Sequence, residues 1–214
     1  MADIVLISDP VVTSIPVEDI GEPLVDLRGR FAIDTRLADR EGAYAHLREG
    51  LVARLSEAQV LLPAGYRLLI VEGFRPPELQ RRYFDEYKDE LRSTFPDMSP
   101  DELHTAASRY VSPIEVAPHT AGAAVDLTLC TDDGTELDMG TPVNATPEQS
   151  GGACYTAAPG ISPEARRHRE ILAAALRAAG LVNYPTEWWH WSYGDRYWAM
   201  TTGAPAALYG PAKF

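Results

Sequence analysis

Apolar residues recur along this chain at two different spacings, and the spacings predict where helices and strands lie. A spacing of three or four positions indicates helices over 40–60, after Pro76-Pro77 and after Ser162-Pro163. The run 66–71 is short, apolar and rich in branched side chains, which predicts a buried strand. The apolar positions on the three helix faces are Tyr44, Leu47, Leu51, Leu55 and Ala58; Leu79, Tyr83, Tyr87 and Leu91; and Ile171, Leu172, Ala175, Leu176 and Ala179.

The remaining segments predict a mixture of short elements. Ser99 and Glu102 have the spacing of a capping box, so we expect a third helix from there to about Tyr110. Because strands and helices do not alternate strictly, we expect one α+β domain over residues 1–214, with a central antiparallel sheet flanked by helices. The other expected elements are a strand at 123–129, a turn at 131–135 with a return strand at 136–139, an irregular loop at 140–161, a helix stop at Gly180 and a strand through 188–191.

Charge and composition exclude several classes of protein. The 214 residues carry 31 acids and 19 lysines and arginines, a net charge of -12, which disfavours a nucleic-acid partner. No apolar run of about 18 residues predicts a membrane helix. The start, 1–9, has no basic region before its apolar run, so we expect no signal peptide and a cytoplasmic protein. Cys130 and Cys154 suffice for one disulfide at most. The sequence leaves the oligomeric state open, and a homo-oligomer is compatible with it.

His119 and Asp126 form the first candidate site. Pro118 and Gly122 mark a turn that leads into the apolar strand carrying Asp126, and the imidazole and carboxylate can meet across that turn. A buried carboxylate is costly unless it is paired or binds a metal. The alternative is that Asp126 accepts backbone hydrogen bonds and His119 is an ordinary turn residue.

Glu187 and His190 form the second candidate site. In a regular strand these two side chains point to opposite faces, so they approach each other only if Glu187 lies at a bend, which Pro185 favours. The alternative is an aromatic core built from the three neighbouring residues Trp188, Trp189 and Trp191.

Together, the two segments supply a set of ligands suited to zinc. Two histidines and one aspartate, His119, Asp126 and His190, leave a fourth position open for water, as in catalytic zinc sites. Glu187 is then the candidate general base. The other histidines, His46, His104 and His168, are predicted to be solvent-exposed residues of helices.

Arg75 is the third candidate. It follows a predicted strand end and precedes Pro76, so its guanidinium is well placed to project into a cleft and stabilise a developing oxyanion. Taken alone, the same arginine is also explained by a pairing with a surface acid.

Four segments occur here in the order typical of a known family: Glu72-Gly73-Phe74-Arg75-Pro76, 118–129, Asp138-Met139-Gly140-Thr141 and 187–191. In these segments the chain resembles the VanX-like D-alanyl-D-alanine dipeptidases, relatives of zinc D-Ala-D-Ala carboxypeptidases and Hedgehog domains, over about 26–198. The resemblance implies a Hedgehog/DD-peptidase-like fold and one zinc ion per chain. It assigns His119, Asp126 and His190 as zinc ligands, Glu187 as the base, Arg75 as the transition-state arginine and Asp138 as the acid that holds the substrate's amino group.

The sequence departs from that family at two places, which concern the substrate pocket. Ala117 and Pro118 replace serines that usually precede the first histidine, and Pro142, Val143 and Asn144 stand where an aromatic and an acid are usual. The function we expect is zinc-dependent hydrolysis of D-Ala-D-Ala or a similar short D-amino-acid dipeptide, in antibiotic resistance or D-alanine recycling. The alternatives are a zinc D,D-carboxypeptidase acting on peptidoglycan stems and a catalytically inactive zinc-containing binding domain.

Overall fold

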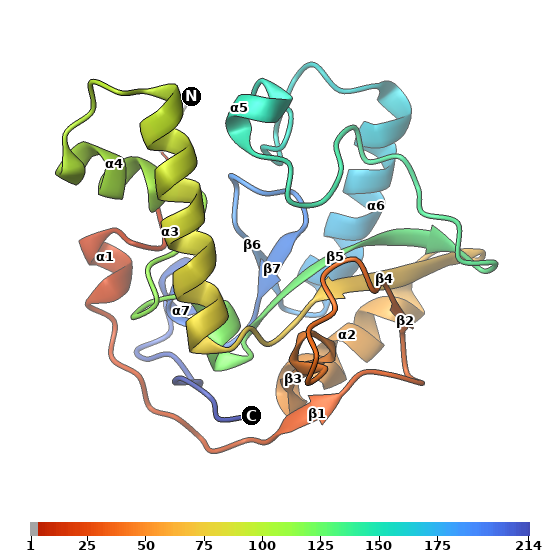
Figure 1. The fold of residues 1–214 in the computed structure, drawn as a ribbon. Coiled ribbons are helices and arrows are strands. Elements are labelled where there is room, and N and C mark those ends of the chain that lie inside the picture. The colour runs from red at the N-terminus through yellow and green to blue at the C-terminus, as the bar shows by residue number, and fades with distance from the viewer. Residues whose placement is uncertain (1–3) are drawn as a thin grey trace.

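A five-stranded sheet crosses the centre of the molecule (Figure 1). The computed structural model describes residues 4–214. The expected absence of a signal peptide rests on residues 1–9, of which Met1–Asp3 lie outside the described residues. The strand order is β2-β4-β5-β7-β6, and β1 and β3 form a separate antiparallel pair. The strands are β1 (Leu24–Asp26), β2 (Ala32–Ile33), β3 (His46–Arg48), β4 (Tyr66–Glu72), β5 (Ala124–Thr131), β6 (Val182–Asn183) and β7 (His190–Ser192).

One pair of strands departs from the predicted antiparallel sheet. β2 runs parallel to β4, with Ala32 opposite Leu69, whereas the other three pairs of this sheet are antiparallel. The prediction was wrong at this edge because the chain passes from β2 through a helix before it enters β4. Such a crossover returns the next strand in the same direction. The α+β class is confirmed, with a mixed central sheet.

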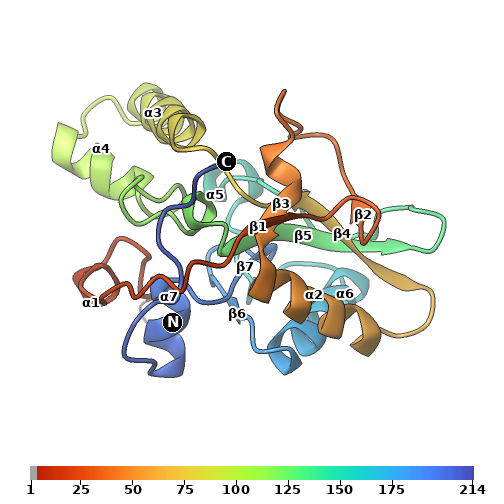
Figure 2. The same ribbon diagram turned by 90° about the horizontal axis from the view of Figure 1, so that it is seen from below.

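Helices cover the two faces of the sheet unequally. Figure 2 shows α2 and α6 together on one face, whereas α3 and α4 stand on the other side. Within residues 4–214, no helix combines the length and the apolar character needed to cross a bilayer. The helices are α1 (Pro10–Thr13), α2 (Glu49–Leu61), α3 (Pro77–Thr94), α4 (Pro100–Ala107), α5 (Pro147–Ser150), α6 (Pro163–Ala178) and α7 (Arg196–Thr202), with 3-10 turns η1 (Ala43–Ala45) and η2 (Pro118–Ala121).

The main hydrophobic core lies between the sheet and the pair α2 and α6. Alternate residues of β5, Val125, Leu127 and Leu129, are fully buried in it. Asp126 lies between two of them in the strand, so its side chain points to the opposite face of the sheet. This alternation separates the apolar core from a polar face, on which the candidate site lies.

Several predicted element boundaries were wrong. The helix expected over 40–60 begins only at Glu49, because β3 pairs with β1 and Asp39 accepts hydrogen bonds from the backbone of Ala43 and Tyr44. The return strand at 136–139 is reduced to one bridge between Cys130 and Glu136. The segment 140–161, predicted to be an irregular loop, contains the short helix α5. Helix α4 ends at Ala107, earlier than the predicted end at about Tyr110. The strand at 66–71 and the capping box of Ser99 and Glu102 are confirmed.

Candidate metal centre and active site

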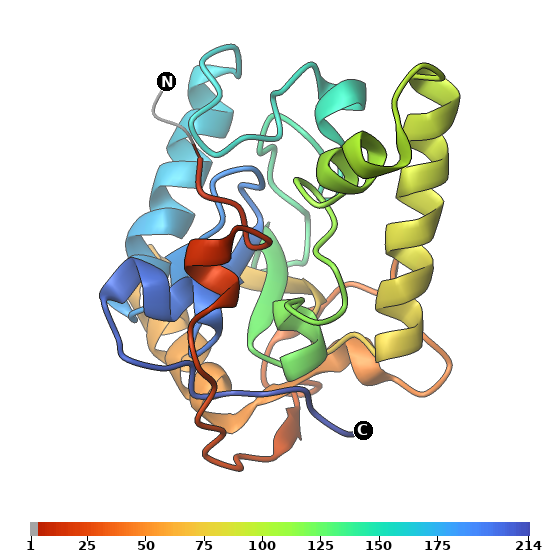
Figure 3. The same cartoon turned by 90° about the vertical axis from the view of Figure 1, so that its left-hand side faces the viewer.

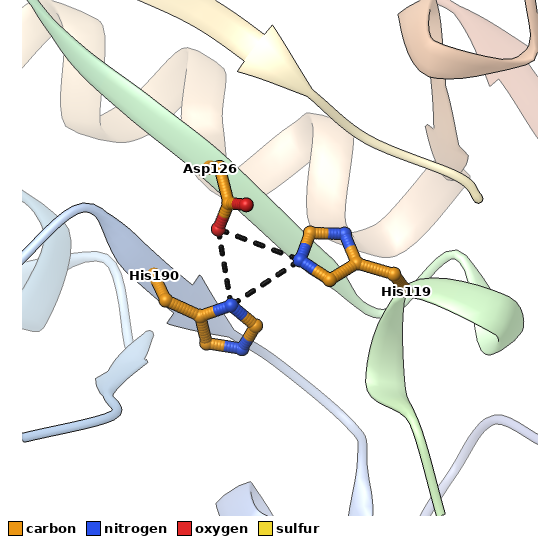
Figure 4. Close-up of side chains that lie close together, drawn as sticks. All are labelled: His119, Asp126 and His190. Atoms are coloured by element: carbon orange, nitrogen blue, oxygen red, sulfur yellow. Dashed lines mark hydrogen bonds and ion pairs between the residues drawn. The ribbon is translucent and has the colours of Figure 1, made fainter. Parts of the chain in front are cut away.

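His119, Asp126 and His190 converge from three separate elements, as Figure 4 shows. His119 comes from η2, Asp126 from β5 and His190 from the first position of β7, where the register pairs it with Asp126. His190 Nδ1 lies 3.0 Å from Asp126 Oδ1 and 3.2 Å from His119 Nε2, and His119 Nε2 lies 3.4 Å from the same Oδ1. All three residues are at most 5% exposed. The predicted meeting of His119 and Asp126 across the turn is confirmed.

The backbone of Gly73 orients His119. His119 Nδ1 lies 2.7 Å from the Gly73 carbonyl, and because a carbonyl only accepts, Nδ1 carries the proton. Nε2 therefore presents its lone pair to Asp126 and His190. Gly73 is itself pressed against the chain, since a Cβ there would lie 2.5 Å from the His46 carbonyl oxygen. A side chain at Gly73 would displace the carbonyl that fixes the imidazole.

The three converging atoms fit a metal ion. They are two imidazole nitrogens and one carboxylate oxygen, ligand types that zinc accepts. Ligand atoms around a tetrahedral zinc ion at ~2.0–2.1 Å lie about 3.3 Å apart, close to the separations found here. His190 Nε2, on the far side of its ring, has no hydrogen-bond partner in the described part of the chain. The arrangement is a His-Asp-His metal-binding site typical of zinc.

Electrostatics favour the protonation states of Asp126 and His190 that a metal requires. Burial alone would raise the pKa of Asp126, but His119 and His190 outweigh it and hold that pKa below its usual range. Burial lowers the pKa of His190, and Asp126 opposes only part of this shift. A carboxylate and a neutral imidazole are the forms that coordinate metals.

Glu187 lies at the bend that the sequence predicted. The chain turns over 184–187, where Glu187 N donates to the Tyr184 carbonyl, and β7 begins only at His190. Glu187 Oε2 lies 3.9 Å from His190 Nδ1, and Glu187 is 7% exposed. Burial first, and the nearby Asp126 charge second, raise the pKa of Glu187 well above its ordinary value. The aromatic-core interpretation also holds for Trp188, Trp189 and Trp191, which are all buried in the main core.

A bulge in β4 brings Arg75 and Glu72 to the same site. The register shifts between Ile70, which faces the core, and Glu72. Because of this shift, Glu72 pairs with Asp126 and does not face the core as Ile70 does. Glu72 Oε1 accepts from Arg75 Nε at 2.8 Å and Oε2 accepts from Nη2 at 2.5 Å. Arg75 Nη2 also lies 3.9 Å from Asp126 Oδ2. Arg75 is therefore paired, but with a buried acid beside the metal cluster rather than with a surface acid.

A cavity of about 340 Å³ opens over these residues. His119, Asp126, His190, Glu187 and Arg75 all line it. Figure 3 shows α3 and α4, coloured yellow to light green, side by side. Four tyrosines also line it, namely Tyr83 and Tyr87 on α3 together with Tyr110 and Tyr184. Two exposed acids of α3, Glu86 and Glu90, complete this part of the lining. In the described chain, this lining contains one arginine, Arg75, and four acids, Asp126, Glu187, Glu86 and Glu90, so acidic groups predominate.

Asp138 lies outside this pocket. Its side chain is exposed, and its Oδ1 accepts a hydrogen bond from Gly140 N at 2.8 Å within its own turn. The structure thus brings together five of the six candidate residues and leaves Asp138 apart. Asn144, from the segment that departs from the family pattern, lines the pocket instead and has a φ of 65°.

The remaining histidines and cysteines have structural surroundings. His168 is 4% exposed and bonds the Asp138 carbonyl through Nδ1, so the prediction of a solvated histidine was wrong. His46 is half-buried in β3 rather than in a helix, whereas His104 is exposed on α4 as predicted. Cys130 and Cys154 are buried free thiols, not a disulfide.

Known proteins resemble this chain over most of its length. A family described as D-ala-D-ala dipeptidase matches residues 25–203. A D-alanyl-D-alanine dipeptidase of Synechocystis sp. is 29% identical over an alignment of 216 positions, which covers 87% of each chain. Another protein of that name, from Escherichia coli, is 26% identical over 144 residues, covering 67% of this chain and 63% of that protein.

Solved structures resemble this chain only distantly. A vancomycin resistance D,D-pentapeptidase, VanY, in complex with Zn(II) has a TM-score of 0.48 and 16% identity, with 90% of each chain covered. VanYB in complex with D-Alanine-D-Alanine has a TM-score of 0.46 and 15% identity, covering 89% of this chain and 93% of that one.

Proposed function

Because this chain belongs to the D-Ala-D-Ala dipeptidase family of metallopeptidases, we propose that it is a zinc dipeptidase that hydrolyses D-Ala-D-Ala or a similar short D-amino-acid dipeptide. The observation that carries the proposal is the buried His119, Asp126 and His190 triangle, which lies in one pocket with a buried carboxyl and a buried guanidinium. A structural zinc site is normally closed by a fourth protein ligand and requires neither of these two groups.

The residues of the chain divide the chemistry among them. When bound, zinc lowers the pKa of a water molecule to roughly 7 and polarises a carbonyl. Glu187 takes the proton from the attacking water and delivers it to the leaving amine, and its raised pKa suits a group that must hold a proton between these steps. Arg75 donates to the carbonyl oxygen as negative charge develops on it. Burial of both residues keeps their charges poorly screened by solvent.

The metal content is expected to depend on His119. The purified protein should contain about one zinc per chain, and His119→Ala should lose most of it, because two ligands hold the ion far more weakly than three. Elemental analysis by mass spectrometry measures the ratio. The matched control is His104→Ala, which removes an exposed histidine outside the cluster and should keep the zinc. A full zinc complement in His119→Ala would show that the ligand set is wrong.

The substrate is expected to carry a free amino group. Glu86 and Glu90 line an acidic pocket, which favours an ammonium and gains nothing from an acylated amine. Zinc-loaded protein should therefore cleave D-Ala-D-Ala but not N-acetyl-D-Ala-D-Ala or a pentapeptide stem. L-Ala-L-Ala, which has a free amine as well, tests the stereochemistry separately. Equal cleavage of the acylated peptides would favour the D,D-carboxypeptidase, and cleavage of none would favour the inactive binding domain.

The same assay separates two assignments of the ammonium. The double variant Glu86→Gln with Glu90→Gln should raise KM for the free dipeptide, because these carboxylates face the pocket. The Asp138→Asn variant tests the role that the family resemblance gave to that acid. A KM increase found only in Asp138→Asn would show that Asp138, and not Glu86 and Glu90, binds the substrate ammonium.

A further inference from the structure

Gln80 lies buried beside Arg75 in the first turn of α3. It is 1% exposed, and both ends of its amide are hydrogen-bonded. Gln80 Oε1 accepts from Arg75 Nη1 at 2.8 Å, and Gln80 Nε2 donates to the Ser112 carbonyl at 2.7 Å. Since Arg75, Gln80 and Ser112 all line the pocket, the Gln80 amide joins the guanidinium to the wall formed by Ser112.

The hydrogen bonds of Arg75 leave part of its guanidinium free. Arginine has five N–H donors in one plane. Glu72 accepts from Nε and Nη2, and Gln80 accepts from Nη1, so three bonds hold the group and two N–H remain. The remaining N–H groups belong to Nη1 and Nη2, and Nη2 is the nitrogen 3.9 Å from Asp126 Oδ2. The free N–H of Nη2 therefore lies on the side of the guanidinium that faces the metal cluster.

Glu72 and Gln80 hold the guanidinium from different parts of the fold. Glu72 is on β4, in the sheet, whereas Gln80 is on α3, which packs chiefly against α4. The link to Ser112 adds the segment that leads to His119. Without Gln80, the guanidinium of Arg75 is held only by Glu72, through Nε and Nη2. The remaining contact from α3 is then the Tyr83 ring, whose centroid lies 4.9 Å from Arg75 Cζ.

We propose that Gln80 is a positioning residue, which acts through Arg75 to aim the free Nη2 N–H group at the carbonyl oxygen of the substrate. This inference rests on the proposed dipeptidase function. Misplacement of a reacting group by about 1 Å costs up to ~10²-fold in rate. Gln80 makes no proton transfer of its own, and its effect is on the orientation of the guanidinium.

The main test replaces Gln80 by methionine, which has a similar length but forms neither hydrogen bond. Gln80→Met should lower kcat by roughly 10- to 10²-fold with little change in KM, because the donor acts on the transition state. Gln80→Glu keeps an acceptor for Arg75 and loses the donor to Ser112, so it should recover most of kcat. The matched control is Gln59→Met, since Gln59 also bonds through both amide ends, to Tyr66 and Leu68, but lies outside the pocket. It should lower the melting temperature without lowering kcat.

A double-mutant cycle distinguishes positioning from general stabilisation. In an Arg75→Ala background, Gln80→Met should cause no further loss of kcat, because the group it aims is gone. If the two losses multiply, or if Gln80→Met keeps wild-type kcat, the positioning role is wrong. Absence of turnover in the zinc-loaded wild type would instead contradict the proposed function.

A spectroscopic measurement tests the positioning even without turnover. In ¹⁵N-¹H spectra of the arginine side chains, assigned with Arg75→Lys, the Nη protons of Arg75 should exchange slowly in the wild type. Gln80→Met should speed the exchange of the Nη1 protons and leave the Nε proton, held by Glu72, protected. Unchanged Nη1 exchange would show that Gln80 does not restrain the guanidinium.

Discussion

Replacing Glu187 by glutamine is expected to lower kcat by at least ~10²-fold while the protein keeps its zinc. The amide has nearly the same shape and still forms hydrogen bonds, but it cannot take the proton of the attacking water. Glu187 Oε2 is 3.9 Å from His190 Nδ1, and the hydrogen bonds that hold the His119 and His190 rings do not involve the Glu187 side chain. Zinc content and melting temperature should therefore stay close to those of the wild type.

The measurement is steady-state hydrolysis of D-Ala-D-Ala with zinc content determined on the same sample. Glu170→Gln is the matched control, because it makes the same change of charge at an exposed position of α6 and should leave kcat unchanged. Turnover near the wild-type rate in Glu187→Gln would remove this residue from the role of base. Loss of zinc together with activity would indicate that Glu187 contributes to holding the metal.

The metal ligands could be predicted because each stands out from its surroundings in the sequence. Asp126 interrupts an apolar strand, and the cost of burying a carboxylate points to a partner. His119 and Glu187 depend on a turn and a bend, both marked by prolines. These are local features, so one sequence is enough to show them.

Buried polar residues on helices were missed for the opposite reason. The pattern of apolar residues placed Leu79 and Tyr83 on the buried face of α3, but that face contains Gln80 and Phe84. His168 likewise shares its helix face with Leu172, whereas the charged residues beside it in the sequence suggested exposure. Hydropathy alone does not show that a polar side chain is buried by hydrogen bonds to distant backbone.

Contacts between distant segments account for most of the remaining differences. The bulge that turns Glu72 toward Asp126 is set by the pairing of β4 with β5, and the start of α2 is set by the pairing of β3 with β1. The role of Asp138 was assigned by resemblance alone, and its carboxylate turns back to Gly140 N, a local bond that aspartate forms readily.

The loss of Arg75 is expected to lower kcat by ~10²–10³-fold, the typical cost of removing one oxyanion donor. Arg75 acts mainly on the transition state, so kcat should fall more than KM rises. Lysine should restore only part of the rate, because it lacks the planar fork that donates to Glu72 and to the substrate at once. Zinc should remain, since no ligand of the cluster depends on Arg75 alone.

Glu72 determines how this experiment must be designed. It is 1% exposed and its charge is paired with Arg75, so Arg75→Ala leaves a buried carboxylate alone, at a cost of about 3–5 kcal/mol in stability. The double variant Glu72→Gln with Arg75→Ala removes that charge and should recover much of the melting temperature. Its kcat should stay as low as that of Arg75→Ala, because the donor is still missing. If the double variant regains wild-type turnover along with its stability, Arg75 serves only to neutralise Glu72, and the oxyanion is stabilised without it.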